Sequence, residues 1–160
     1  MRFLGFIALV LFGCFVQEVE VLVPEGYEGT VVIIYGENED QNSQPISNQI
    51  NVYTIPSDGV ISSKVKPSNG FKRFSLFSYN AAGVKSELPI IYSHGDIDPE
   101  SSQIVGYNPR VGGKVERFSE DGDLQKSYPT YLDLLVGRMS QIDSLSKRRD
   151  DFIFEKVYNR

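Results

Sequence analysis

The densest group of residues that could do chemistry is the segment His94–Glu100, with the sequence His-Gly-Asp-Ile-Asp-Pro-Glu. His94, Asp96 and Asp98 alternate along it, and an imidazole with carboxylates is a donor set for a divalent cation. An EF-hand loop would need a glycine at its sixth position and a distant glutamate, which this segment does not supply. We therefore predict a polar loop that holds no metal or other cofactor. A metal-dependent envelope hydrolase built on these three side chains is the alternative.

Nucleophilic catalysis has little support in the sequence. His94 is the chain's only histidine, so a Ser-His or Cys-His mechanism would have to use it. Ser93 precedes it directly, and neighbours on a strand point to opposite faces, so the two side chains make a poor dyad. The segment Gly112-Gly113-Lys114 lacks the rest of a phosphate-binding loop. The sequence thus nominates no catalytic residue, and we expect a protein that is not an enzyme.

Cys14 offers different chemistry, because it is the chain's only cysteine and ends an apolar leader. One cysteine excludes an internal disulfide. The leader, Phe3–Phe12 after Met1-Arg2, has the length of a signal-peptide core and is too short to span a bilayer. Its end, Leu11-Phe12-Gly13-Cys14, resembles the bacterial lipobox, in which the cysteine receives a diacylglyceryl group and the chain is cleaved in front of it. We expect lipidation of Cys14; conventional secretion and an uncleaved segment are the alternatives.

These features predict three parts of the chain. Residues 1–13 form a lipoprotein signal peptide, residues 14–18 the anchor and a short tether, and residues 19–160 a single β-rich domain. Two or three acyl chains hold a protein on a membrane stably, whereas one chain is marginal. The predicted location is therefore the bacterial cell membrane or the outer membrane, where the lipid-anchored domain faces the periplasm or the exterior.

Length and composition fit one ordinary domain, because 160 residues with 41% hydrophobic and 23% charged side chains can form a real core. The net charge of −5 argues against nucleic-acid binding, which needs a basic face. The basic run Lys147-Arg148-Arg149 is followed at once by Asp150-Asp151. That leaves an envelope protein or a small ligand as the partner beside the membrane, and the sequence does not identify which.

The segment Val19–Tyr35 predicts two strands joined by a tight turn, which we interpret as a hairpin. Gly26 and Gly29, on either side of Tyr27, allow positive φ in this turn. The second half, Thr30–Tyr35, is apolar on both faces and predicts a central strand covered on both sides. Tyr27 is a candidate contact residue at the turn; the alternative is that its ring packs over the hairpin.

Strand-length segments and turn signals alternate through the middle of the chain. Pro56–Gly59 and Asn80–Gly83 predict turns. Gly36–Asn48 predicts a long polar loop, and Pro89 predicts an edge strand or a bulge. This pattern predicts a mainly β fold, a single sandwich-like or open-barrel antiparallel domain with a C-terminal helix.

The last third of the chain leaves two interpretations open. Ile104–Tyr107 and Lys114–Phe118 predict short strands, and apolar residues then recur at the three- and four-residue spacing of a helix. Gly137 inside a helix would cost about 1 kcal/mol relative to alanine, whereas at a junction it costs little. We therefore predict a strand at about 130–136 and a helix at about 138–149; a single helix over both ranges is the alternative.

The segment Val21–Tyr35, with its Pro-Glu-Gly-Tyr-Glu-Gly turn, resembles a family of small, uncharacterised bacterial lipoproteins. In them a lipobox signal precedes a strand-turn-strand with a hydrophobic-Pro-Glu-Gly-Tyr-x-Gly motif. Ile55–Ile61 and Phe77–Leu88 are similar to that family's middle strands, whereas Thr30 departs from the aromatic residue usual at its position. The resemblance implies an envelope location and a β-rich fold, and it implies no activity, because the family has none assigned.

Overall fold

The computed structural model describes residues 17–36, 43–47, 50–64, 72–93, 100–113, 115–118, 121–122 and 124–159. Cys14 and the loop residues His94, Asp96 and Asp98 lie outside these ranges, so the predictions made for them stay predictions. Across the described ranges, no helix has the length and apolarity to cross a membrane.

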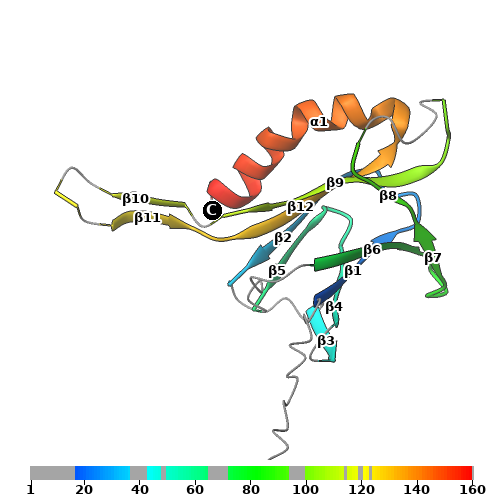
Figure 1. Cartoon of the computed structure of the whole chain (residues 1–160), viewed down its shortest axis with the longest axis horizontal. Coiled ribbons are helices and arrows are strands. Elements are labelled where there is room, and N and C mark those ends of the chain that lie inside the picture. Colours follow the sequence, from blue (N-terminus) through cyan, green and yellow to red (C-terminus); the bar gives the residue numbers. More distant parts are fainter. Residues whose placement is uncertain are drawn as a thin grey trace, which may run out of the picture.

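Two five-stranded sheets and a C-terminal helix form three layers (Figure 1). Sheet A contains, in spatial order, β3 (Ser43–Ser47), β4 (Ile50–Thr54), β1 (Gln17–Pro24), β6 (Lys72–Tyr79) and β7 (Lys85–Leu88). Sheet B contains β5 (Val60–Ser63), β2 (Gly29–Tyr35), β12 (Tyr131–Arg138), β9 (Ile104–Gly112) and β8 (Ile90–Ile91). The helix α1 (Met139–Ile153) lies over the outer face of sheet B and continues into a π-helical turn, η1 (Phe154–Tyr158). The predicted mainly β fold with a C-terminal helix is confirmed.

Both sheets are mixed, whereas the sequence predicted antiparallel pairing. The strand β1 lies between β4 and β6 and runs parallel to both, and β2 runs parallel to β5 and antiparallel to β12. The reason is that the chain leaves sheet A after β1 and enters sheet B as β2, so these sequential strands do not pair. The predicted hairpin over Val19–Tyr35 is therefore wrong, because its two strands belong to different sheets.

The turn between β1 and β2 uses its two glycines for different purposes. Gly26 has a φ of 74°, which suits a residue without a side chain. Gly29 is already part of β2 and does not have a positive φ. A Cβ on Gly29 would lie 3.1 Å from the hydroxyl oxygen of Tyr27. This glycine therefore makes room for the tyrosine ring, which packs over the turn.

Apolar side chains fill the space between the two sheets and the space under the helix. The strand β2 contributes to both, since Val31 and Ile33 belong to the core between the sheets and Val32 and Ile34 pack under α1 and η1. All four side chains are fully buried. The prediction of a central strand covered on both sides is confirmed.

The predicted turns form as expected. The backbone N–H of Gly59 donates to the carbonyl of Pro56 at 3.0 Å. In the next turn, the side-chain oxygen of Asn80 accepts hydrogen bonds from the backbone N–H groups of Ala82 and Val84, each at 3.0 Å. This turn closes the antiparallel hairpin of β6 and β7.

Pro89 marks a change of sheet, because it separates β7, the edge of sheet A, from β8, the edge of sheet B. Another expectation is wrong, because residues 43–47, predicted to lie in a polar loop, form the edge strand β3.

The predicted strand at Ile104–Tyr107 forms and continues to Gly112 as β9. The register between β9 and β12 shifts opposite Asp133, and Asn108 has a φ of 47°. A bulge thus accommodates the residues that interrupt the apolar pattern.

The end of the chain follows the strand-plus-helix interpretation, with α1 extending beyond the predicted residue 149. Gly137 lies inside β12 and does not end it. A Cβ there would come within 2.8 Å of Leu145 Cδ1 on α1, so the close approach of the helix explains this glycine. Between β9 and β12, β10 (Val115–Phe118) and β11 (Leu124–Tyr128) form a two-stranded ribbon that projects from the body (Figure 1).

Candidate binding cleft

A partly buried group of charged side chains fixes α1 on sheet B. Asp133 interrupts an apolar stretch of β12, and only 1% of its surface is exposed. Arg149 of α1 is 2% exposed, and its guanidinium donates to Asp133 Oδ1. Arg110 of β9 donates to the same oxygen at 3.3 Å and to Asp150 Oδ1 at 3.1 Å. We call Arg110, Asp133, Arg149 and Asp150 the charge cluster.

Arg149 also satisfies main-chain acceptors around the bulge in β9. Its guanidinium donates to the carbonyl of Asn108 at 2.8 Å and to the carbonyl of Asp133 at 3.2 Å. One side chain therefore joins β9, β12 and α1. A buried charge is tolerated when it is paired and hydrogen-bonded in this way.

Burial shifts both members of the central ion pair toward their neutral forms. It raises the pKa of Asp133, and the attraction of Arg149 and Arg110 opposes that rise. Burial likewise lowers the pKa of Arg149, against the attraction of Asp133. Among the described residues, Asp133 Oδ2 has no hydrogen-bond partner, so the carboxylate depends on the arginines at Oδ1. The charge cluster therefore determines where α1 lies on sheet B.

The position of α1 leaves a cleft between the helix and two turns of the sandwich. The side formed by the sandwich has two parts. Tyr27–Thr30 come from the turn after β1 and the start of β2, and Ser57 and Asp58 come from the turn after β4. The cavity measures about 550 Å³, a size typical of small-ligand sites. The helical side of the cleft is formed by Leu145, Arg148, Asp151, Phe152 and Glu155.

The side chain of Tyr27 is fixed by a hydrogen bond and by close packing. Its hydroxyl donates to the carbonyl of Thr30 at 2.8 Å, and a Cβ on Gly59 would collide with both of these groups. Burial, and secondarily the charge of Asp58, raise the pKa of Tyr27 to about 12, so the phenol is neutral at physiological pH. The residue that the sequence singled out as a candidate contact therefore lines the cleft while its ring packs over the turn.

Two carboxylates of the cleft are already paired. Glu28 accepts a hydrogen bond from Gln141 Nε2 at 2.7 Å and lies 3.4 Å from Arg138 Nε. Glu155 lies 2.7 Å from Lys156 Nζ. Their charges are therefore partly compensated within the chain.

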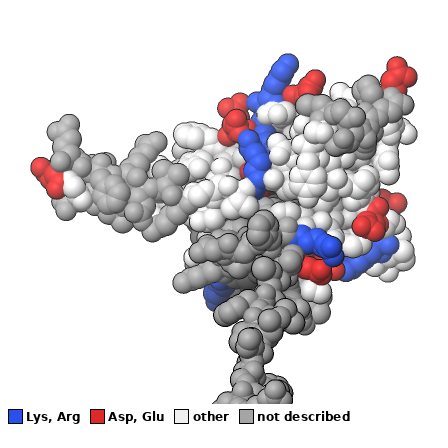
Figure 2. All heavy atoms as spheres, in the orientation of Figure 1, with Lys and Arg blue, Asp and Glu red and all other residues white. Residues whose placement is uncertain are grey.

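The other two carboxylates, Asp58 and Asp151, have no cation within ion-pair distance in the described part of the chain. Asp58 is held in place because its Oδ1 accepts the backbone N–H of Val60 at 3.2 Å. The arginine of the cleft, Arg148, donates to the carbonyl of Ser144 at 3.3 Å. Figure 2 shows charged side chains gathered over α1, with largely uncharged described surface beside them. The cleft thus has an excess of negative charge.

This excess does not create a metal centre in the described residues, where no three His, Cys, Asp or Glu side chains lie close enough to hold an ion. Sequence reasoning found Tyr27 but did not predict Asp58 or Asp151 as site residues. Asp58 was visible only as a turn residue, and Asp151 only as part of the acidic pair after the basic run. Their shared location depends on where α1 lies, for which the local sequence gives no signal.

Comparisons with known proteins found a family model and a solved structure that are similar to this chain. A family model described as "Family of unknown function (DUF6843)" matches residues 17–122, which include both turns of the cleft and exclude α1. Among solved structures, the chain is similar to a crystal structure of a "Putative Lipoprotein from Bacillus anthracis", with 20% sequence identity, coverage of 89% of this chain and 97% of that chain, and a TM-score of 0.47. No curated protein is similar to this chain at the significance we required.

Proposed function

The chain belongs to the DUF6843 family, whose function is unknown, and from this premise we propose that it is an exported, lipid-anchored binding protein. The anchor is Cys14, and the membrane is the bacterial cell membrane or the outer membrane. The folded domain faces the periplasm or the exterior. The cleft beside α1 binds a positively charged ligand or the basic side chain of an envelope protein.

The support for the anchor is the leader and the cysteine that ends it. An apolar segment too short to span a bilayer runs directly into Leu11-Phe12-Gly13-Cys14, the order of residues that lipoprotein processing needs. The described fold begins at Gln17, so the domain follows the cysteine after two residues.

The binding role depends on one observation, the cleft with its unpaired carboxylates. Asp58 and Asp151 line opposite sides of a cavity of about 550 Å³, and neither has a cation beside it among the described residues. The aromatic ring of Tyr27 also lines it, and such rings attract cations over their faces. Phe152 lines it as well, with Lys156 Nζ already 5.8 Å from the centroid of its ring. Glu155 lies in the last turn of the helical run, where the helix dipole adds negative potential. These features together favour the binding of a positively charged ligand.

We propose binding without catalysis, because no described residue of the cleft pairs a nucleophile with a base. A carboxylate-lined cleft without such a pair offers charge and shape to a ligand. The ligand class that follows is an amine or a lysine- or arginine-bearing peptide.

The anchor is tested by growth with labelled palmitate, with and without globomycin, an inhibitor of the lipoprotein signal peptidase. The wild-type protein should incorporate label, and globomycin should cause the unprocessed form to accumulate. The Cys14→Ala variant should incorporate none. Equal labelling of both proteins would show that the lipid is elsewhere or absent from this cysteine.

The cleft is tested by titrating a lysine tripeptide into the wild-type protein and into the double variant Asp58→Asn/Asp151→Asn, in which residue 58 keeps a side-chain oxygen that can accept the backbone N–H of Val60. Exposed ion pairs contribute about 0.2–1 kcal/mol each, so removing two charges should weaken binding roughly two- to thirty-fold. Binding to the wild type should also weaken with added salt, because exposed charges are screened.

The matched control removes the same charge far from the cleft. Glu87 on β7 and Asp121 between β10 and β11 are both exposed, and the double variant Glu87→Gln/Asp121→Asn has the same net charge as the cleft variant. Its affinity for the tripeptide should equal that of the wild type. Equal weakening in both double variants would mean that net charge alone attracts the peptide, and the cleft proposal would fail.

A further inference from the structure

We infer that the lipid tether keeps the cleft on the side of the domain that faces away from the membrane. The cleft then takes its cationic partner from the aqueous phase and not from the headgroups of the anchoring membrane. This inference rests on the proposed anchor at Cys14, and it adds an orientation and a source of ligand to the proposed function.

The tether between Cys14 and the domain is short. Cys14 is three residues before Gln17, where β1 begins, and three extended residues reach about 10 Å. The start of β1 must therefore lie within about that distance of the lipid headgroups. Because β4 and β6 run parallel to β1 in closely matched register, all three strands begin at this end of the domain.

The cleft lies at the opposite end of these strands. The turn that follows β1 provides Tyr27 and Glu28, and the turn that follows β4 provides Ser57 and Asp58. An eight-residue strand such as β1 spans roughly 23 Å. Along the strand direction, the cleft is thus about twice as far from the start of β1 as the tether can reach.

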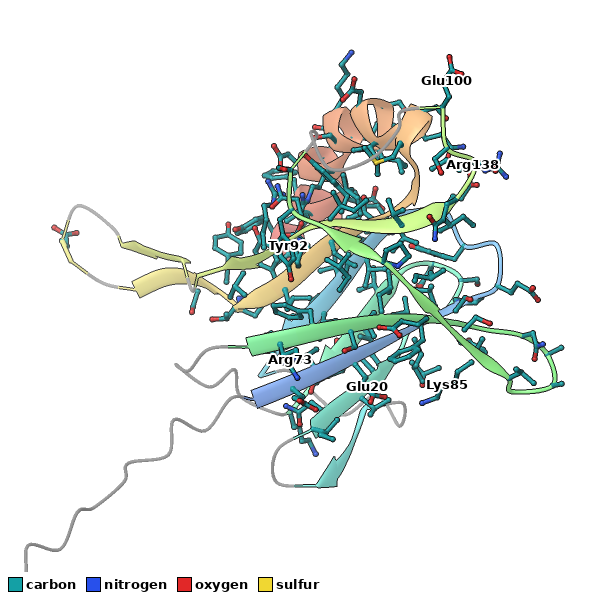
Figure 3. All side chains as sticks on the ribbon, turned by 45° about the vertical axis from the view of Figure 1, so that its right-hand side comes forward. Glu20, Arg73, Lys85, Tyr92, Glu100 and Arg138 are labelled. Atoms are coloured by element: carbon teal, nitrogen blue, oxygen red, sulfur yellow. The ribbon has the colours of Figure 1, made fainter. Side chains whose placement is uncertain are left out.

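The helical side of the cleft also lies on the face of the domain opposite the tether. The tether joins sheet A, whereas the helical side of the cleft is beyond sheet B. Packed sheets are about 10 Å apart and a helix is about 10 Å across. Roughly 20 Å of protein therefore separates the tether from the helical side of the cleft. In Figure 3, Arg73 near the start of β6 and Arg138, which pairs with Glu28 of the cleft, lie at opposite corners of the domain.

These two separations have the same consequence for the ligand. With about 10 Å of slack, the domain can stand on the ends of β1, β4 and β6 or lie on the outer face of sheet A. In both positions the helical side of the cleft lies roughly 20 Å or more from the bilayer surface. A headgroup amine of the anchoring membrane cannot reach it, whereas a soluble amine or a basic peptide can.

The test uses acylated protein with one introduced cysteine, since thioether formation consumes the sulfur of Cys14 and leaves the new thiol as the labelling site. Arg148→Cys places a fluorophore at the helical side of the cleft, where the native side chain is exposed. Arg73→Cys places one near the start of β1, where the native side chain is 74% exposed. Each labelled protein is reconstituted into vesicles whose headgroups contain a short-range paramagnetic quencher. We expect loss of most emission from position 73 and little loss from position 148.

Flotation of the vesicles separates the two ways in which the test can fail. If the labelled proteins that retain Cys14 do not float with the vesicles, the proposed anchor at Cys14 is wrong, and the inference is overturned with it. If the protein floats and position 148 is quenched as strongly as position 73, the anchor stands and the orientation alone is overturned. The Cys14→Ala protein with Arg148→Cys should neither float nor be quenched.

Discussion

Replacing Arg149 with methionine tests whether the charge cluster holds α1 on the sheet. Arg149 is 2% exposed and donates to Asp133 Oδ1, to the Asp133 carbonyl and to the Asn108 carbonyl. Methionine has a similar length and no charge. The variant would leave Asp133, which is 1% exposed, with Arg110 at 3.3 Å as its remaining side-chain partner.

The expected loss of stability is large, because removing one member of a buried ion pair costs about 3–5 kcal/mol. A domain of this kind has a total unfolding free energy of about 5–15 kcal/mol. Arg149→Met should therefore lower the midpoint of urea unfolding strongly while the dependence of the unfolding free energy on urea stays the same.

Two further variants make this result interpretable. Arg148→Met changes the adjacent exposed arginine, whose Nε donates to the carbonyl of Ser144, and it should change stability by less than about 0.5 kcal/mol. The double variant Asp133→Leu/Arg149→Met buries no unpaired charge and should recover most of the loss. If Arg149→Met costs no more than Arg148→Met, the charge cluster does not position the helix and the reasoning is refuted.

Two other predictions concern the wall of the cleft. Gly59→Ala should destabilise the domain by about 1–3 kcal/mol more than Gly26→Ala in the same urea assay, because both glycines have positive φ but only at Gly59 would a Cβ meet Tyr27 and the Thr30 carbonyl; equal losses would contradict this. The pKa of Tyr27 is raised from 10.0 to about 12, so its stabilising contribution is present below pH 10 and is lost as the pH rises toward 12. The stability difference between wild type and Tyr27→Phe should therefore shrink over that interval, and a constant difference would show that Tyr27 does not titrate as described.

The parts of the fold that local sequence predicts are those that local chemistry determines. Thr30–Tyr35 is β-branched and apolar on both faces, and it forms a strand covered on both sides. Pro56–Gly59 and Asn80–Gly83 have turn chemistry, and both form turns. The parallel pairing of β1 with β4 and β6 was not predicted, because partners far apart in the sequence leave no local pattern.

The sequence contains a signal for the charge cluster that the prediction did not use. Asp133 is an acid inside the apolar run Leu132–Val136, and a buried acid requires a partner. Arg149 ends the basic run Lys147-Arg148-Arg149, which was considered only as a candidate basic face for nucleic-acid binding. Sixteen residues separate the two, so only the docking of α1 brings them together, and the cleft follows from the same docking. That is why the candidate site could not be predicted from the sequence.

The mass of the intact protein purified from the envelope decides whether a lipid on Cys14 anchors the domain. We expect a chain that begins at Cys14, without residues 1–13, and with the added mass of a diacylglyceryl group or of three acyl chains on that residue. A chain that retains Met1, or one with a free thiol at Cys14, would contradict it.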